Sequence, residues 1–326
     1  MRKVWLAVGL GAAGFAGYYY LWRIAPPAGH RTSRPTRSYD EAVARIRALQ
    51  AAEGDEINPL CRTVLLDHGH ATRRVFLLLH GYTNCPHQFH QLAPQLHAAG
   101  DTVFVPLQPL HGRVVRQPAD LGRATPALLT AFLDEVVDIA CGLGQELVVL
   151  GFSFGGVLAG WAATRRPEIR RAILVSPAFG LRAVPPHLRR LYANVLPRRR
   201  DEFRWWDPVL KEQKPGPEHA YLGYSTRGVG TLLQMSLLVE QAAQRHAPAA
   251  HSICVVINPS DEIVDNRAAL ALAELWRRQG ADVKVVSFPA EDRLIHDLMD
   301  PAQPKQQVDK VYPFLLDVIG RPEVAP

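Results

Sequence analysis

Ser153 lies in a segment whose pattern is that of an activated nucleophile. Residues 151–155 read Gly-Phe-Ser-Phe-Gly, with a glycine two positions to either side of the serine. An apolar run ends at Leu150 and a helical pattern covers 157–165, so the serine is expected on a tight turn between a strand and a helix. Side chains at the two glycine positions would collide with neighbouring backbone on such a turn. The segment therefore predicts a serine that attacks an ester-like carbonyl.

A serine hydroxyl is a weak nucleophile, so it needs a histidine base whose tautomer is fixed by a carboxylate. When a serine sits on such a turn, the acid and then the histidine follow it along the chain. Asp261 follows the apolar run 253–257, and His296 alone among the 13 histidines follows the last apolar run, 283–288. We therefore expect Asp261 as the acid and His296 as the base. Asp265, one turn further along, stays an alternative acid.

The oxyanion formed by the attack needs two backbone N–H donors already in place. One is expected from Phe154, directly after the serine. The other is expected from Tyr82, which follows the apolar run 75–79 and the dipeptide His80-Gly81. A simple turn is the alternative interpretation of that dipeptide.

Apolar runs alternate with helical patterns from residue 62 onward, which is typical of a mostly parallel sheet covered by helices on both faces. In such sheets ligands bind at the carboxyl ends of the strands, where the candidate residues fall. The predicted strands are 75–79, 102–106, 147–150, 172–176, 253–257 and 283–288, and predicted helices include 126–139, 268–278 and 308–319.

From about residue 73 to its C-terminus the chain resembles the α/β-hydrolase superfamily, in its carboxylesterase, monoacylglycerol lipase and lysophospholipase-like branch. The resemblance rests on His80-Gly81, the 151–155 turn, Asp261-x-x-Val264 and His296. It implies Ser153 as nucleophile, Asp261 as acid and His296 as base, the Tyr82 and Phe154 amides as oxyanion donors, and no metal or organic cofactor.

Two segments depart from the pattern of these relatives. Residues 110–112 read Leu-His-Gly where many relatives have Gly-His-Gly, and the loop of Asp261 lacks a leading glycine. Neither departure removes a catalytic group, but both leave the substrate class open. Ser153 itself argues against the related dehalogenases and epoxide hydrolases, which carry aspartate at this position.

The formal net charge of +6 is concentrated in two segments. Residues 1–50 contain eight basic and two acidic residues, and residues 181–250 contain eleven and six, whereas the remainder is slightly acidic. A charge distributed in this way does not indicate a nucleic-acid partner.

The first basic segment contains a stretch without charged residues from Val4 to Trp22. At about 1.5 Å per residue, a helix of this length nearly spans a hydrocarbon core of about 30 Å. Residues 1–23 are therefore predicted to be a membrane anchor, with tyrosine and tryptophan at the interfaces. A cleaved signal peptide, which would place the protein outside the membrane, is the alternative. Residues 24–60 are interpreted as a linker and an N-terminal helix, and residues 61–326 as the hydrolase domain.

The second basic segment, residues 181–250, is far longer than an ordinary connection between two strands and is predicted to be a cap or lid over the site. We call it the cap segment. Leu188, Leu191, Tyr192, Val195 and Leu196 follow helical spacing, with arginines off that stripe. The plain interpretation is that this stripe packs over the site and the arginines are solvated. The alternative is that the cap also contacts an anionic membrane surface.

The four cysteines, Cys61, Cys85, Cys141 and Cys254, contain no C-x-x-C pair, which argues against a zinc or thioredoxin-like site. They are expected to be buried thiols, with a disulfide conceivable if the domain is exported.

The sequence thus predicts a serine carboxylic ester hydrolase that acts through an acyl-enzyme, on lipid-like or medium- and long-chain acyl esters. The same acyl-enzyme captured by an alcohol would make the protein an acyltransferase. A non-catalytic binding protein on a hydrolase scaffold is a third possibility, which the complete set of candidate residues disfavours.

Overall fold

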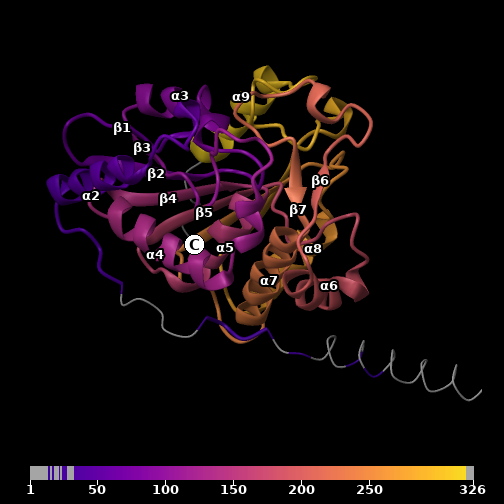
Figure 1. Ribbon diagram of the computed structural model, residues 1–326. Coiled ribbons are helices and arrows are strands. Elements are labelled where there is room, and N and C mark those ends of the chain that lie inside the picture. The colour runs from indigo at the N-terminus through magenta and orange to yellow at the C-terminus, as the bar shows by residue number, and fades with distance from the viewer. Residues whose placement is uncertain (1–13, 15–16, 18–21, 23, 28–32, 321–326) are drawn as a thin grey trace, which may run out of the picture.

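The computed structural model describes residues 14, 17, 22, 24–27 and 33–320, and its centre is a seven-stranded sheet (Figure 1). The strand order is β1-β3-β2-β4-β5-β8-β9, in which β1 runs antiparallel to β3 and every other neighbouring pair is parallel. The strands are β1 (Val64–Leu66), β2 (Thr72–Leu79), β3 (Thr102–Val105), β4 (Gly144–Phe152), β5 (Ile169–Val175), β8 (Ser252–Ile257) and β9 (Val283–Ser287).

Helices cover both faces of this sheet (Figure 1). One face is packed by α2 (Tyr39–Ala52), α4 (Pro126–Ala140), α5 (Phe154–Arg165), α7 (Thr226–Ala243) and α8 (Asn266–Arg278), and the other by α3 (Leu92–Ala98) and α9 (Val308–Gly320). Short 3₁₀ turns are η1 (Pro59–Cys61), η2 (Pro86–Phe89), η3 (Ala119–Arg123), η4 (Pro186–Leu188), η5 (Leu196–Arg198), η6 (Lys211–Gln213) and η7 (Ala290–Asp292). The predicted mostly parallel sheet with helices on both faces is confirmed.

Strand β2 shows why apolar runs form the middle of this sheet. Residues 75–79 are fully buried, because β2 lies between β3 and β4 and is covered on both faces. All six predicted strands overlap observed ones. The sequence analysis missed β1, which is short, only partly buried and paired at the edge of the sheet.

The predicted membrane anchor, residues 1–23, lies outside the described residues apart from Gly14, Gly17 and Trp22. Within the part of the chain that the structure does describe, no helix has both the length and the apolar character needed to cross a membrane.

The cap segment contains α6 (Arg189–Val195), a two-stranded antiparallel sheet and helix α7. The small sheet is formed by β6 (Phe203–Trp205) and β7 (Gly223–Ser225). The predicted amphipathic stripe is only half-buried on α6, and α7 packs into the main core beside α5.

The expectation that the arginines of the cap segment are solvated is wrong for Arg189. Its guanidinium donates to the carbonyl oxygen of Phe179 (3.0 Å) and pairs with Glu240 of α7. Arg198, Arg199 and Arg200 are exposed as expected. Arg189 therefore joins the start of α6 to the body of the protein.

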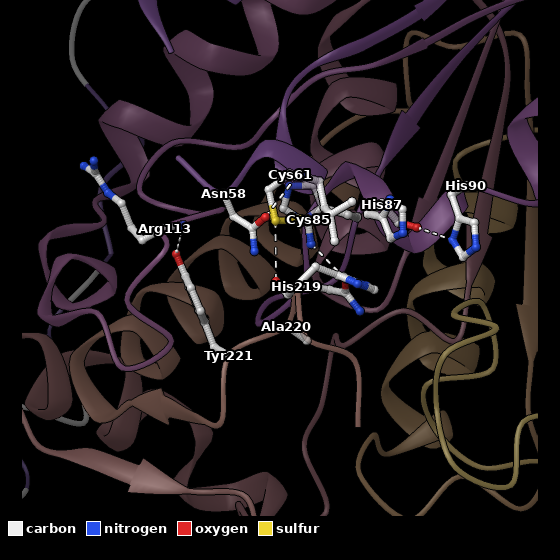
Figure 2. The surroundings of a disulfide bond; sticks show 12 residues. Asn58, Cys61, Cys85, His87, His90, Arg113, His219, Ala220 and Tyr221 are labelled. Atoms are coloured by element: carbon white, nitrogen blue, oxygen red, sulfur yellow. Dashed lines mark hydrogen bonds between the residues drawn. A yellow bond between two sulfur atoms is a disulfide. The ribbon is translucent and has the colours of Figure 1, made fainter. Parts of the chain in front are cut away.

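The expectation of four thiols is wrong for Cys61 and Cys85, which form a disulfide (Figure 2). The spacing gave no sign of this bond, because the two cysteines lie on η1 and just before η2, and only the fold brings their Cα atoms to 5.2 Å. Cys141 and Cys254 remain thiols, the latter buried as expected.

Candidate active site

The turn between β4 and α5 holds Ser153 in a strained conformation. Its φ angle is +54°, in the left-handed region that disfavours residues other than glycine. A Cβ atom at Gly151 would lie 2.0 Å from the carbonyl oxygen of Gly155, and one at Gly155 would lie 1.9 Å from that of Leu79. The two glycines are therefore required by close backbone contacts, as the sequence pattern predicted.

Two hydrogen bonds connect Ser153, His296 and Asp261. The Oγ atom of Ser153 lies 2.9 Å from Nε2 of His296, and Nδ1 of His296 lies 2.7 Å from Oδ2 of Asp261. The exposed fraction is 7% for Ser153 and 1% for Asp261. Since Asp261 accepts from Nδ1, the proton of a neutral His296 is on Nδ1, and Nε2 is left to accept the serine proton.

The carboxylate of Asp261 is held by its own loop. Its Oδ1 accepts from the backbone N–H groups of Ile263 and Val264, both at 2.9 Å, which leaves Oδ2 for the histidine. The alternative acid, Asp265, instead caps helix α8 and pairs with Arg267. The bond to Arg267 holds the pKa of Asp265 below its usual range. The structure thus brings Asp261, and not Asp265, to His296.

Asn258 ties the loop of Asp261 to the loop of His296. Its side-chain amide donates to the carbonyl oxygens of Leu294 (3.0 Å) and Ile295 (3.2 Å), the two residues before His296. Asn258 is buried and directly follows β8. The sequence analysis missed this residue, although its position after a strand was a usable signal.

The backbone N–H groups of Tyr82 and Phe154 are available at the site. Phe154 is the first residue of α5, and the first N–H groups of a helix have no partner inside it. Within the described residues, neither N–H has a hydrogen-bond acceptor.

His80 orients the peptide that carries the Tyr82 N–H. The N–H of Gln108 can only donate, so Nε2 of His80 accepts from it (3.1 Å) and Nδ1 carries the proton. Nδ1 then donates to the carbonyl oxygen of Gly81 (3.0 Å). Because a trans peptide is planar, fixing that carbonyl fixes the opposite direction of the Tyr82 N–H. Burial lowers the pKa of His80 well below its usual value, which keeps the ring neutral.

His111 supports the same loop from the segment that follows β3. Its Nε2 donates to the carbonyl oxygen of Tyr82 at 2.6 Å, and burial lowers the pKa of the imidazole. Leu110 and Gly112, on either side, have positive φ angles. The Leu-His-Gly departure noted in the sequence therefore keeps a histidine that holds the Tyr82 loop.

The side chain of Tyr82 extends toward the cap segment. Its ring packs edge-on against Phe154, with centroids 5.8 Å apart, and its hydroxyl donates to the carbonyl oxygen of Ser225 (3.2 Å) at the start of α7. Burial raises the pKa of this phenol far above its usual value, so the hydroxyl keeps its proton.

The described residues contain no group of three or more histidine, cysteine, aspartate or glutamate side chains arranged to hold a metal ion.

Comparison with known proteins identifies the family of this chain. The sequence model described as "Alpha/beta hydrolase family" matches residues 76–316, which is well over half of the chain. The chain belongs to the α/β hydrolase family. The matched range begins inside β2 and ends inside α9, so it includes every candidate residue named above.

Several lipolytic α/β hydrolases are similar to this one. A thermostable monoacylglycerol lipase of Bacillus sp. (strain H-257) is 26% identical over 194 residues, which are 58% of this chain and 70% of the lipase. A structure of the metagenome-derived lipolytic enzymes LipS and LipT superposes with a TM-score of 0.59 at 18% identity, covering 81% of this chain and 98% of that one. A monoacylglycerol lipase of Paleococcus ferrophilus gives 0.56 at 16% identity, covering 79% and 97%. At these identities the structural likeness shows the shared fold.

Proposed function

We propose that the protein is a serine hydrolase that cleaves carboxylic esters through an acyl-enzyme. The observation that carries the proposal is the chain of hydrogen bonds from Ser153 through His296 to Asp261, beside two N–H groups without protein acceptors. This arrangement supplies a nucleophile, a base and electrostatic stabilisation at one point.

The proposed reaction has two halves. His296 takes the proton of Ser153 as Oγ attacks the ester carbonyl, and Asp261 stabilises the imidazolium that forms. The oxyanion is stabilised by the N–H groups of Tyr82 and Phe154. Collapse of the intermediate expels the alcohol, which takes the proton from His296, and leaves an acyl-serine. Water then attacks this acyl group with His296 again acting as base, which releases the acid.

We further propose lipid-like acyl esters as the substrate class. The support is the similarity to a monoacylglycerol lipase and to lipolytic structures, together with the basic cap segment.

A series of p-nitrophenyl esters from acetate to palmitate tests both parts of the proposal, with wild type and Ser153→Ala compared. We expect turnover that Ser153→Ala reduces by a factor on the order of 10⁴ or more, with higher kcat/KM on longer chains. Absence of Ser153-dependent turnover on every ester would refute the hydrolase. Turnover confined to acetate would refute the lipid-like substrate alone.

Membrane attachment through residues 1–23 is part of the proposal and rests on the sequence. The end of the predicted anchor lies beside the cap segment, since the carbonyl oxygen of Trp22 accepts from Asn194 (3.0 Å) and the Trp22 ring lies under the guanidinium of Arg198 (4.5 Å). A cap segment in this position supports a contact with anionic lipid through Arg198 and its neighbours. If removal of residues 1–21 abolished all binding to anionic liposomes at low salt, the cap segment would have no membrane contact of its own.

We also propose that the hydrolase domain faces an oxidising compartment, because the Cys61–Cys85 disulfide would not persist among reduced cytosolic thiols. When cells are lysed directly into denaturant with N-ethylmaleimide, Cys61 and Cys85 should stay unlabelled unless a reductant is added first, and labelling of both without reductant would refute the oxidising compartment.

A further inference from the structure

A buried polar cluster is formed around the residues that follow His296 in the chain. It contains two carboxylates, Asp297 and Asp300, of which Asp300 is fully buried. Three amide side chains and one histidine donate to them. The donors are Asn84, Gln88, His219 and Gln303.

Asp297, the residue next to His296, contacts the loop after β2 at two points. Its Oδ1 accepts from Nε2 of Gln88 (2.7 Å), and its Oδ2 accepts from Nδ2 of Asn84 (3.2 Å). Asn84 also accepts from the backbone N–H of Cys85 (2.9 Å) and donates to Asp300 (2.9 Å). The loop that carries the Tyr82 N–H is therefore connected through Asn84 and Gln88 to the loop that carries His296.

Gln88 continues this connection to the backbone beside Tyr82. Its Oε1 accepts from the N–H of Gly81 at 2.9 Å, and its side chain is 1% exposed. The carbonyl oxygen of Gly81 is held by His80 on the other side. Gly81 thus has both peptide groups fixed, and the second of these groups ends in the Tyr82 N–H.

We propose that Gln88 and Asp297 are positioning residues for the ester hydrolysis, which hold the Tyr82 oxyanion donor in register with His296. The inference rests on the proposed function. The Tyr82 N–H and the His296 imidazole come from loops that are distant in the sequence, yet both must be correctly placed around the reacting carbonyl. Displacement of the N–H by a fraction of an ångström would weaken its hydrogen bond to the oxyanion. The Gln88 side chain, hydrogen-bonded to Gly81 at one end and to Asp297 at the other, fixes the distance between the two loops.

The protonation state of Asp297 determines how well its carboxyl group accepts hydrogen bonds. The titratable groups that face Asp297 are Asp300 and His296 on its own loop and Tyr312 of α9, and His219 of the cap segment donates to Asp300. Burial and the nearby Asp300 raise the pKa of Asp297 to about 6. At pH 8 the ionised carboxylate accepts from all three amides.

Gln303 provides a matched control for Gln88. Its Nε2 donates to Oδ2 of the same carboxylate at the same distance, 2.7 Å, but Gln303 lies beyond His296 in the chain and makes no contact with the Tyr82 loop. Gln88→Met and Gln303→Met each remove one hydrogen bond to Asp297. Only the first frees the Gly81 peptide.

The test measures kcat, KM, Tm and inhibition by a trifluoromethyl ketone at pH 8. Such a ketone forms a tetrahedral adduct with the serine, whose oxyanion occupies the site of the two donors. We expect Gln88→Met to lower kcat and weaken the ketone by about tenfold or more, with KM within about twofold. Gln303→Met should lower Tm by less, because it removes one hydrogen bond at a half-buried position, and should keep kcat within about threefold. Asp297→Asn should have little further effect on kcat in the Gln88→Met background.

Three results would overturn the inference. They are an equal loss of kcat in Gln88→Met and Gln303→Met, a loss of Tm without loss of kcat in Gln88→Met, or additive losses of kcat in the double variant Gln88→Met/Asp297→Asn. Wild-type turnover separates this outcome from failure of the proposed function. If wild type lacks Ser153-dependent turnover, the function fails. If wild type shows Ser153-dependent turnover and Gln88→Met has the same kcat as wild type, only the positioning role fails.

Discussion

The hydroxyl of Tyr82 donates to the carbonyl oxygen of Ser225 across 143 positions of the sequence. Tyr82 is therefore shared between two parts of the molecule. Its backbone lies at the candidate site, and its ring ends at the first turn of α7, where the cap segment joins the core. A change at the start of α7 can thus reach the backbone of Tyr82, the proposed oxyanion donor, through one side chain.

Gly228 on α7 tests this connection. A Cβ atom there would lie 1.9 Å from the Tyr82 hydroxyl and 2.9 Å from the carbonyl oxygen of Leu121. We expect Gly228→Ala to displace the Tyr82 ring and lower kcat on p-nitrophenyl butyrate by about tenfold. Tyr82→Phe, which removes the clashing oxygen, should restore part of that loss. A wild-type kcat in Gly228→Ala would show that displacement of the Tyr82 ring does not affect catalysis.

Substitutions of Asp261 and Asp265 should have opposite effects on activity and stability. Asp261→Asn should reduce kcat by a factor of about 10³–10⁴ and change stability little, because the histidine loses the acceptor that fixes its tautomer. Asp265→Asn should keep kcat, and it should lower the free energy of unfolding by up to about 1 kcal/mol as the Arg267 pair is lost. Steady-state kinetics and urea unfolding of both variants check this. The reverse pattern would assign the acid to Asp265.

The disulfide is expected to stabilise the fold. It closes a loop with a sequence separation of 24, for which restriction of the unfolded chain contributes about 3 kcal/mol. The double variant Cys61→Ser/Cys85→Ser should lose about that much in denaturant unfolding, and wild type should lose as much in dithiothreitol. Cys141→Ser serves as the control and should respond little. Titration of four thiols in the unreduced, denatured wild type would contradict the bond.

Buried histidines should make the protein sensitive to mild acid. Burial lowers the pKa of His111 in the folded state, so below about pH 6.5 the unfolded chain binds a proton that the folded one does not. The contribution is present above about pH 6.5 and is lost as the pH falls through the lowered folded-state pKa of His111.

Urea unfolding of wild type and His111→Gln at pH 7.5 and at pH 5.5 measures this loss. Glutamine keeps a donor for the carbonyl oxygen of Tyr82 and does not titrate, so the free energy of unfolding of His111→Gln should fall less between the two pH values than that of wild type. Parallel losses in the two proteins would show that His111 does not titrate differently on folding.

The sequence predicted the parts of the site that depend on local pattern and chain order. Ser153 lies on a turn whose glycines have a steric reason, and Asp261 and His296 each follow a strand of a parallel sheet. The choice between Asp261 and Asp265 needed coordinates, because both lie in one loop and a hydrogen bond to His296 depends on how that loop folds.

Contacts between distant loops could not be predicted in the same way. Gln88, Asn258 and Asp297 are ordinary polar residues in the sequence, and their role depends on burial and on partners far along the chain. Arg189 and the Cys61–Cys85 pair were misjudged for the same reason. Their surroundings are tertiary, and neither residue spacing nor residue type reveals them.

The Cys61–Cys85 bond also bears on where this enzyme begins. The family match starts at residue 76, but Cys61 and strand β1 lie before that point. A shortened chain that started at the family boundary would omit half of β2, leave the edge of β3 unpaired and deprive the Tyr82 loop of its covalent support. The folded unit is therefore larger than the range that the family model matches, and residues before that range belong to the same sheet and disulfide.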